Sequence, residues 1–386
     1  MSKLETLIRQ LCPDGVEYKR LGDVLTIKNG RDYKSFESGS VPVYGSGGIM
    51  AYINTAVYDK PSVLIPRKGS LEKLYYVDKP FWNVDTIFYT EINTELVCPK
   101  FVYYWLAKQH LERLNKAGGV PSLTQAVLNK VTIPVPPLEI QREIVRILDN
   151  FTELTAELTA ELTAELTARK KQFQFYHKQF FEFKKSDCIQ IVCIKDICEL
   201  LTGYPFDSSQ FTATGIHLLR GMNIKRGILD YSESNNRYWN SVQGYEKFLL
   251  STDDIVIAMD GSLVGKSYAQ VKSNHLPSLL VQRVTRVRVT KANAHYIYHY
   301  ISSGAFTRYV EKKKTGGAVP HISLKDIANF KIPLPSENMQ KEIADSLDRF
   351  DALCNDLTSG LPAEIAARQK QYEYYRDKLL TFKKRS

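Results

Sequence analysis

The sequence predicts an α/β (α+β) chain in which two globular domains are separated by two long antiparallel helices, with a pseudo-two-fold internal repeat. Three observations predict this fold class. The chain has 386 residues, of which 44% are hydrophobic, and this is enough apolar material for packed cores in two or three domains. Part of the first half recurs in the second half. Each copy of the repeat carries apolar residues at helical spacing.

The internal repeat is visible when the sequence is compared with itself. A shift of 199 residues aligns residues 120–185 with residues 319–384 without a gap, and 25 of the 66 positions are identical. Upstream, the halves match weakly at an offset of 173, through Gly30 over Gly203, so about 26 extra residues lie between Gly203 and Gly316. The duplication predicts two equivalent modules. The strongest blocks are Ile-Pro-Val-Pro at 133–136 over Ile-Pro-Leu-Pro at 332–335, Gln-Arg-Glu-Ile at 141–144 over Gln-Lys-Glu-Ile at 340–343, and Leu-Asp-x-Phe at 148–151 over 347–350.

The first repeated segment predicts one long helix. After the prolines at 134–137, apolar residues recur at helical spacing, and no Gly or Pro interrupts residues 138–185. A helix of roughly 45 residues would be about 65–70 Å long and needs a partner along its length. The second copy supplies that partner as an antiparallel helix. Gly360 and Pro362 predict a kink or a short break in it.

Three identical Thr-Ala-Glu-Leu tetrads run from Thr155 to Leu166. Each tetrad rises about 6 Å and exceeds a full turn by about 40°, so the leucine stripe drifts around the helix. The tetrads are either a plain spacer of good helix formers or a spacer whose copy number sets the distance and rotation between two DNA-binding modules, since B-DNA turns by about 34–36° per base pair. The predicted spacer and subunit-interface residues are Leu154, Leu158, Leu162, Leu166, Leu353, Leu357, Leu361 and Ile365.

The segments between the repeats predict two modules built from short strands. Each module ends in an aromatic segment, at 101–106 and 295–300, which predicts a helix with a packing role. The predicted strands are residues 41–44, 62–65 and 85–89 in the first module and 254–259 and 283–289 in the second. The predicted domains are 1–137 and 186–336 for the modules, 138–185 for the central helix and 337–386 for the distal helix.

Glycine-rich loops of both modules carry polar and cationic side chains that suit contacts with phosphates and base edges. The formal net charge of +10 is compatible with a polyanionic partner. For any single loop residue, a solvated turn is the competing interpretation. The candidates are Arg31, Tyr33, Lys34, Tyr44, Ser46, Arg67 and Lys68 in the first module, and Arg220, Asn223, Lys225, Arg226, Ser262, Lys266, Gln282 and Arg283 in the second.

The candidate catalytic and metal-binding motifs do not have the residue spacing that these sites require. The run from Gly261 to Ser267 is one residue too short between its glycines for a phosphate-binding loop. His295 and His299 lack the adjacent Glu of a zinc protease, so a surface or packing pair is the better interpretation. The cysteines at 12, 98, 188, 193, 198 and 354 form no Cys-x-x-Cys pair and are interpreted as reduced thiols. Binding without a catalytic or metal site is therefore predicted.

The sequence also carries no secretory signal and no apolar run of 18 residues. A cytoplasmic protein without membrane contact is therefore expected.

Taken together, these features resemble a specificity subunit of type I restriction–modification systems over essentially the whole chain. The resemblance rests on the duplicated Gly-Gly…Val-Pro…Ile-Pro-x-Pro…Gln-x-Glu-Ile…Leu-Asp-x-Phe block, the Arg-x-Lys-Gln…Tyr…Phe-Lys-Lys helix ends and the Thr-Ala-Glu-Leu tetrads. It implies two target-recognition domains, each reading half of a bipartite double-stranded DNA site. The repeated helices would form a spacer that docks two modification subunits, and the tetrads resemble a subfamily in which their copies set the gap.

The same resemblance implies which subunits of the complex carry out each reaction. Modification subunits bind S-adenosylmethionine and methylate adenine N6, and restriction subunits use ATP and Mg²⁺ for translocation and cleavage. The present chain would then supply specificity and hold no cofactor. Two alternatives stay open: a bivalent scaffold that joins two proteins without touching DNA, and a single-chain nuclease with an unrecognised site.

Overall fold

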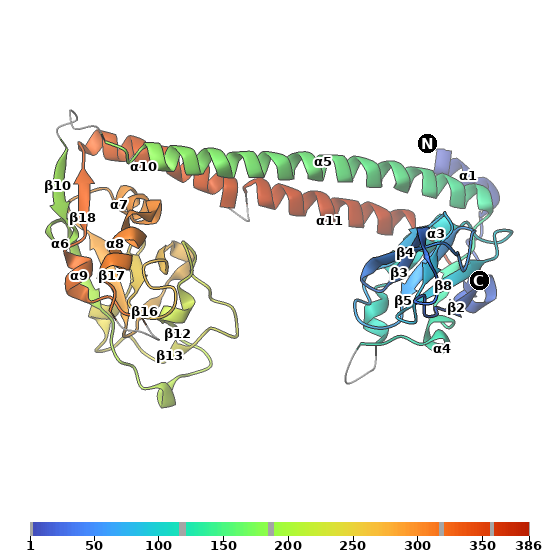
Figure 1. Ribbon diagram of the computed structural model, residues 1–386, viewed down its shortest axis with the longest axis horizontal. Coiled ribbons are helices and arrows are strands. Elements are labelled where there is room, and N and C mark those ends of the chain that lie inside the picture. Colours follow the sequence, from blue (N-terminus) through green and yellow to red (C-terminus); the bar gives the residue numbers. More distant parts are fainter. Residues whose placement is uncertain (1–2, 116–120, 184–188, 316–319, 356–358, 386) are drawn as a thin grey trace. The chain divides into compact units, whose positions relative to one another are not determined.

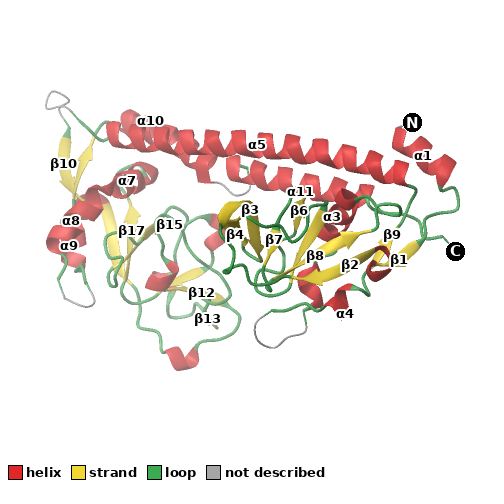
Figure 2. Ribbon diagram, turned by 45° about the vertical axis from the view of Figure 1, so that its right-hand side comes forward, coloured by secondary structure: helices red, strands yellow, loops and turns green. Residues whose placement is uncertain are grey.

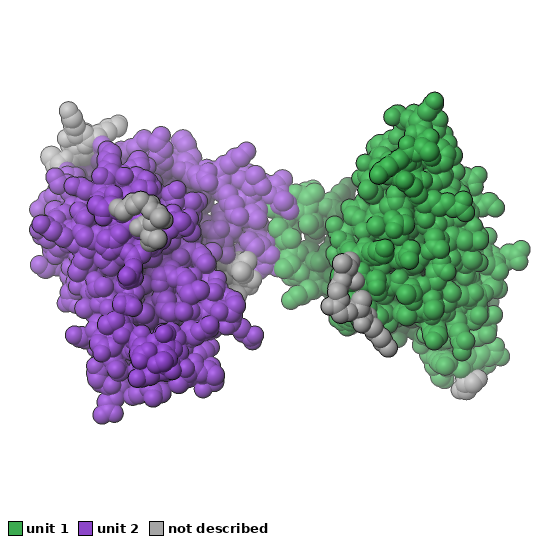
Figure 3. Space-filling view, turned by 60° about the horizontal axis from the view of Figure 1, so that its bottom comes forward, with its two compact units in different colours: residues 1–162, 365–386 green, residues 163–364 purple. Residues whose placement is uncertain are grey.

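The computed structural model describes residues 3–115, 121–183, 189–315, 320–355 and 359–385. The chain forms two compact units, which Figure 3 shows in different colours. Unit 1 comprises residues 1–162 and 365–386, and unit 2 comprises residues 163–364. Each unit therefore contains one of the predicted modules together with part of both predicted helical segments.

Unit 1 contains a four-stranded sheet in the order β2-β8-β5-β6, a three-stranded sheet in the order β4-β3-β7, and the pair β1-β9. Strand β5 is buried along its whole length because β8 flanks it and helix α3 packs on it. The elements are α1 (Lys3–Leu11), β1 (Tyr18–Arg20), α2 (Leu21–Val24), β2 (Leu25–Asn29), β3 (Ser38–Gly45), β4 (Gly48–Ile53), β5 (Ser62–Pro66), β6 (Tyr75–Val77), β7 (Trp82–Asn83), β8 (Ile87–Ile92), α3 (Pro99–Lys108), the 3-10 turn η1 (Leu111–Leu114), α4 (Gln125–Leu128) and β9 (Thr132–Pro134).

Unit 2 repeats this plan, with sheets in the orders β11-β17-β14-β15 and β13-β12-β16 and the pair β10-β18. Its elements are β10 (Gln190–Cys193), α6 (Ile194–Ile197), β11 (Cys198–Thr202), η3 (Ser208–Gln210), β12 (Ile216–Leu219), η4 (Gly221–Asn223), β13 (Tyr238–Trp239), η5 (Glu246–Phe248), β14 (Ile255–Ala258), β15 (Tyr268–Gln270), η6 (Ser273–His275), β16 (Ser278–Leu280), β17 (Val284–Val289), α7 (Ala294–Tyr300), the π-helical turn η7 (Ile301–Ala305), α8 (Phe306–Lys313), α9 (Leu324–Ala328) and β18 (Lys331–Leu334).

The strand registers locate the extra residues of the second half. Tyr44 pairs with Asn83 in the way that Leu219 pairs with Leu280, and Ile65 pairs with Phe88 in the way that Ile257 pairs with Thr285. The interval between the first members of these pairs is 21 residues in unit 1 and 38 in unit 2. Most of the extra length therefore lies between β12 and β14, inside the interval that the repeat predicts.

The helical segments fold largely as the repeat predicts. Helix α5 (Leu138–Gln179) is one continuous helix of 42 residues (Figure 1). The second copy is divided into α10 (Glu337–Asn355) and α11 (Leu361–Leu379), which confirms the predicted break near Gly360.

The same aromatic contact joins α5 to its partner helix in each unit. In unit 1, the rings of Phe151 on α5 and Tyr375 on α11 stack with centroids 5.8 Å apart. In unit 2, Phe350 on α10 and Tyr176 on α5 stack at 5.7 Å. The shift of 199 residues maps each pair onto the other, so the same contact forms twice.

Each unit has two structurally distinct ends. Strands β2 and β5 end, and β8 begins, at one end of the sheet, whereas β8 leads to α3 at the opposite end (Figure 2). There, Ile140, Ile144 and Leu148 of α5 belong to the same buried core as α3 and the sheet, and Ile343 and Leu347 of α10 join the core of unit 2. Each fully buried side chain of this size stabilises the fold by about 1.5–3 kcal/mol.

Candidate nucleic-acid interface

Four segments of unit 1 meet at one end of its sheets, and we call this end loop edge 1: residues 30–31, 45–48, 66–69 and 83–86. They meet because the strand pairing brings Asn29 opposite Phe88, Pro66 opposite Ile87 and Tyr44 opposite Asn83. The predicted residues Arg31, Ser46, Arg67 and Lys68, which are far apart in the sequence, therefore share one edge.

Thr86 holds the backbone of loop edge 1 in place. The Ser46 amide donates to the Thr86 hydroxyl oxygen at 3.3 Å, and the amides of Arg67 and Lys68 donate to the Thr86 carbonyl at 2.9 and 3.2 Å. The Arg67 guanidinium lies over the Phe88 ring, 5.7 Å from its centroid. The Lys68 ammonium lies 3.8 Å from the Asp85 carboxylate, but both side chains are largely exposed, so this ion pair contributes little. The edge thus combines a fixed backbone with accessible cations.

The glycine that both halves share has a steric cause. A Cβ atom on Gly30 would lie 2.0 Å from the Val84 carbonyl oxygen, and a Cβ atom on Gly203 would lie 2.3 Å from that of Val281. Any larger residue would push β2 or β11 away from the loop before β8 or β17. The same close approach therefore shapes the equivalent edge of unit 2, which we call loop edge 2: residues 203–204, 220–222, 258–262 and 280–283.

An ion pair organises loop edge 2. The Arg283 guanidinium donates to the Asp260 carboxylate at 2.6 Å, and the His321 ring contacts the other oxygen of the same carboxylate. Burial alone would raise the pKa of Asp260, but the hydrogen bonds from His321 and Arg283 outweigh burial and hold this pKa below its usual range. Because 71% of the Arg283 side chain is exposed, the guanidinium is positioned at the edge yet open to an anionic partner.

The opposite end of each unit, which we call the helix joint, is built around a buried glutamine. In unit 1, the Gln141 side chain donates to the Pro136 carbonyl at 2.7 Å and accepts from the Cys98 amide at 2.7 Å. In unit 2, Gln340 donates to Pro335 at 2.8 Å and accepts from the Asn293 amide at 2.9 Å. These two equivalent side chains fix the start of α5 and α10 to the loop before α3 and α7.

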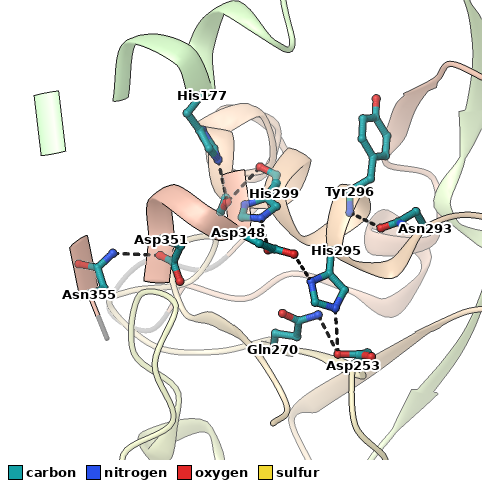
Figure 4. A network of polar contacts seen from close by, with 11 residues as sticks. His177, Asp253, Gln270, Asn293, His295, Tyr296, His299, Asp348, Asp351 and Asn355 are labelled. Atoms are coloured by element: carbon teal, nitrogen blue, oxygen red, sulfur yellow. Dashed lines mark hydrogen bonds and ion pairs between the residues drawn. The ribbon is translucent and has the colours of Figure 1, made fainter. Parts of the chain in front are cut away.

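About two turns further along, each helix places an aspartate against the aromatic helix. Asp149 accepts from the Lys100 ammonium at 2.8 Å and from the Tyr104 hydroxyl at 2.7 Å. The equivalent Asp348 contacts both His295 and His299 at 2.7 Å (Figure 4). The two histidines therefore share one carboxylate and have a structural role, in agreement with the packing interpretation of their spacing.

The comparisons with known proteins decide the family. A family model described as the type I restriction modification DNA specificity domain matches residues 13–168 and 187–367. The chain is 37% identical over 298 residues to the specificity subunit of the type I restriction enzyme EcoR124I/EcoR124II of Escherichia coli, covering 74% of this chain and 71% of that protein. It belongs to the type I restriction–modification specificity subunit family.

Further similarities extend over nearly the whole specificity subunit. A putative type I restriction enzyme specificity subunit of Haemophilus influenzae is 27% identical over 379 residues, which cover 95% of this chain and 96% of that protein. Among solved structures, a chain of a type I R-M system studied for complex assembly and conformational transition superposes with a TM-score of 0.65 at 17% identity, covering 95% and 98% of the two chains. The HsdS subunit from Thermoanaerobacter tengcongensis gives 0.54 at 17% identity, covering 96% and 97%. These structures confirm the predicted fold class.

As a member of this family, the specificity subunit is a non-catalytic component that recognises DNA, and neither the scaffold nor the nuclease alternative is supported. Within the described residues, no group of three His, Cys, Asp or Glu side chains is placed to hold a metal ion. In the same part of the chain, no helix combines the length and apolar character needed to cross a bilayer. Cys188 lies outside the described residues.

Loop edge 2 of the specificity subunit includes Arg220 but excludes the side chain of Asn223. Asn223 is fully buried, and its amide donates to the carbonyl oxygens of Asp230 and Asn235 at 2.9 and 3.2 Å. This placement corrects the prediction that Asn223 contacts DNA, because its hydrogen-bonding groups are used inside the fold. Arg220 is half-buried and donates to Asn235 at 2.7 Å, and burial lowers its pKa.

The remaining candidates of unit 2 are divided between loop edge 2 and a different surface. Ser262 and Gln282 are exposed at the edge, and Lys266 is half-buried behind it. Lys225 and Arg226 lie in the turn between Ile224 and Leu229. Arg226 lines a cavity of about 450 Å³ together with Tyr268 and His177, near the helices.

In unit 1, the two candidate tyrosines are half-buried. The Tyr44 ring lies 5.8 Å from the Tyr75 ring and 6.3 Å from the Phe81 ring, and burial raises its pKa. Tyr33 packs against the cluster that contains Trp82. Because part of each ring stays accessible, the assignment of both tyrosines as DNA contacts stays a prediction. Lys34 is exposed in the loop that follows loop edge 1.

Sequence reasoning missed several residues at the edges. Thr86 and His321 organise the two edges, and β4 exposes three large apolar side chains, Ile49, Met50 and Tyr52. His321 could have been found from the repeat, because it aligns with Ser122, which forms a bridge to Lys68 as His321 does to Asp260. No pattern in the sequence distinguishes the β4 residues from an ordinary half-buried strand.

The spacer leucines follow the drift expected of a four-residue repeat. Leu154 is 62% exposed and Leu162 only 8% exposed, with Leu158 and Leu166 half-buried. In the second copy, Leu353 is 37% exposed, Leu361 is 7% exposed and Ile365 is half-buried. Leu357 lies outside the described residues. The stripe thus turns away from one face of α5, as an excess of about 40° per tetrad requires.

Proposed function

We propose that units 1 and 2 each read one half of a bipartite double-stranded DNA target, through loop edges 1 and 2. The observation that carries this proposal is the duplication of the edge within a duplicated frame. Gly30 and Gly203 make the same close approach, and the same joint fixes each unit to a helix at its opposite end. Two edges that differ in side chains but not in frame suit two different half-site sequences.

In this proposal, α5 with α10 and α11 sets the gap between the half-sites and docks two modification (methyltransferase) subunits. Exposed apolar side chains on these helices, including Leu154, Phe175 and Tyr374, support a docking role. The modification subunits hold S-adenosylmethionine, and restriction subunits bring ATP and Mg²⁺. The complex acts in the cytoplasm on chromosomal or invading DNA.

We further infer that the chain belongs to the subgroup in which Thr-Ala-Glu-Leu copies set the gap. The tetrads of residues 155–166 lie within the uninterrupted helix α5, so one tetrad more or less would change the helix by about 6 Å and about 40°. A change of that size approximates the rotation of B-DNA over one base pair, at 10–10.5 base pairs per turn.

Methylation mapping tests the DNA-reading role. DNA from cells that express this chain with its modification subunit is compared by long-read sequencing with DNA from cells that lack the chain. A bipartite adenine motif that depends on the chain is the expected result, and it also gives both half-sites and the gap. The absence of any chain-dependent motif, with both proteins expressed, would refute the proposal.

Deleting one tetrad, residues 159–162, tests the spacer role in the same assay. The gap in the motif should change while both half-sites keep their sequences. The matched control replaces Thr159 by Ala and preserves helix length, so its motif should equal that of the wild type. A deletion that altered a half-site sequence would contradict the spacer role.

A further inference from the structure

Strand β4 of unit 1 exposes apolar side chains where a folded sheet normally hides them. Ile49 is 49% exposed, Met50 59% and Tyr52 53%, and the three lie within four residues. Isolated exposed apolar residues are common on protein surfaces, but adjacent ones typically mark a binding surface. This group adjoins loop edge 1, because the β3–β4 turn forms part of that edge.

A β-bulge places Met50 outside the regular ladder. Val43 pairs with Ala51 and Tyr44 pairs with Ile49, so Met50 is the extra residue between them. Bulges redirect a side chain and occur often beside functional sites. The redirected side chain lies over the turn, since a Cβ atom on Gly45 would lie 2.5 Å from the Met50 sulfur. Gly45 therefore leaves room for Met50 at the edge.

The surroundings of this turn are cationic and polar. Beside the Ser46–Thr86 contact, a Cβ atom on Gly69 would lie 3.3 Å from the Ser46 hydroxyl oxygen, so the loop that carries Arg67 and Lys68 touches the turn. A binding partner that contacts Met50 would thus meet two cations next to an apolar side chain. A nucleic acid offers this combination, with phosphates beside its bases.

Loop edge 2 also presents a methionine, although it occupies an earlier position in the frame than Met50 does. The strand registers make Leu219 equivalent to Tyr44, so Met222 corresponds to residue 47 in the turn after β3. Met222 is 50% exposed, and Leu263, in the loop that follows Asp260, is 43% exposed. Both edges therefore combine cations with a half-exposed methionine in the turn region.

We propose that Met50 and Met222 read thymine methyl groups in the major groove, one in each half-site. This inference rests on the proposed DNA-reading function. The major groove admits a two-stranded β-ribbon such as β3–β4, and the thymine C5-methyl is the apolar group that it displays. A methionine side chain is flexible and polarizable, which suits contact with a methyl group whose exact position varies with DNA shape.

Uracil substitution provides a direct test, because it removes only the methyl group. The full chain, assembled with its modification subunits, is titrated with duplexes of the mapped target in which each thymine in turn is replaced by uracil. At least one replacement in each half-site should weaken binding about fourfold, the effect expected for losing contact with one methyl group. Met50→Ala should abolish this penalty in one half-site only, and Met222→Ala in the other only.

Met50→Ala and Met222→Ala serve as controls for each other, and two further variants serve as additional controls. Met50→Leu keeps an apolar side chain and should retain a uracil penalty. Leu11→Ala removes an apolar side chain that is 42% exposed on α1, and it should leave every penalty unchanged. Thermal unfolding of each variant should match the wild type, because the replaced side chains lie largely in solvent.

The outcomes separate the two proposals. If the wild-type complex does not distinguish the mapped target from a scrambled duplex, the DNA-reading function fails. If it does distinguish them but Met50→Ala and Met222→Ala keep the wild-type uracil penalties, methyl reading is overturned. It is also overturned if the variants weaken binding while the uracil penalties persist, the result expected for an apolar wedge between base steps.

Discussion

The carboxylate at each helix joint has different partners in the two units. In unit 1, Asp149 is held by Lys100 and Tyr104, whereas in unit 2 the equivalent Asp348 is held by His295 and His299. The frame is the same, because the glutamine and the aspartate recur at both joints. The partners differ in chemical type, since an ammonium group and a phenol hold Asp149 and two imidazole rings hold Asp348.

A second exchange strengthens this contrast. His177, near the end of α5, is 8% exposed in unit 2, and the repeat aligns it with Arg376, whose side chain is 12% exposed in unit 1. Burial, with a smaller contribution from His299, lowers the pKa of His177 to about 4. An arginine at this position stays charged at all ordinary pH values. A duplicated frame can therefore keep its geometry while one copy gains a buried histidine whose protonation destabilises it.

The largest expected effect tests what the joints have in common. Gln141→Ala and Gln340→Ala should each cost about 3 kcal/mol, because each leaves buried backbone groups without hydrogen-bond partners. Hydrogen exchange of α3 and α7 peptides in the full chain measures the local loss. The exposed Gln243 provides the control, and Gln243→Ala should change neither region. A large loss in one unit only would show that the joints are not equivalent.

The next effect separates the units on the acid side. Because the folded-state pKa of His177 lies below the unfolded value, the folded state binds this proton less readily. The contribution of His177 to the stability of unit 2 is thus complete above about pH 6.5, and about 3 kcal/mol of it is lost as the pH falls to about 4.

The acid-side loss should be smaller in His177→Gln, and the pH dependence of unit 1 should not change in Arg376→Gln. Hydrogen exchange at several pH values distinguishes the units. If His177→Gln keeps the full pH dependence of wild-type unit 2, other groups cause it.

A smaller effect concerns the carboxylates themselves. Asp149→Asn and Asp348→Asn should each cost about 1–2 kcal/mol, since the amide replaces a charged acceptor but preserves the shape of the side chain. Denaturant unfolding, followed by hydrogen exchange in α3 and α7, measures both. Asp345→Asn, on the exposed side of α10, is the matched control and should have no measurable effect.

The smallest effect lies on the alkaline side of unit 2. The hydrogen bond to Asp348 and the nearby Asp253 raise the pKa of His295 above its usual value, despite burial. The resulting stabilisation is complete below the unfolded-state pKa of about 6.5 and is lost as the pH rises through the raised value. Because 38% of the side chain is exposed, solvent screening keeps the loss small. His295→Gln should remove it, and a persistent alkaline loss would contradict this assignment.

The repeat predicted the frame of the molecule well. Identical residues at equivalent positions, such as Gln141 and Gln340, form the same hydrogen bonds. The duplicated sequence also predicted the long helix, its antiparallel partner and the break near Gly360. The alignment also pairs Gly30 with Gly203, and the structure shows that both make the same close approach. The self-alignment was sufficient here because it pairs equivalent residues directly, even where a partner, such as Cys98 for Gln141, lies 43 residues away.

The edges were predictable only as a set of candidate loops. The side chain of Asn223 points into the fold because the backbone carbonyls of Asp230 and Asn235 lie beside it. No local sequence pattern predicts that placement. Met50 was not among the predicted contacts because a one-residue bulge cannot be recognised from the alternation of apolar and polar residues in the sequence. The aspartate partners were missed because Lys100 and His295 share no identity. Tertiary placement, not residue type, decided each case.

The opposite placement of loop edge and helix joint has an evolutionary consequence. The additional residues between β12 and β14 of unit 2 adjoin the loop edge, and they leave the contacts of Gln340 the same in kind as those of Gln141 in unit 1. Insertions and substitutions can therefore accumulate at one end of a unit without loosening its attachment at the other. Recognition surfaces can therefore change during evolution while the helix joint is retained. The two halves of such a protein can diversify independently.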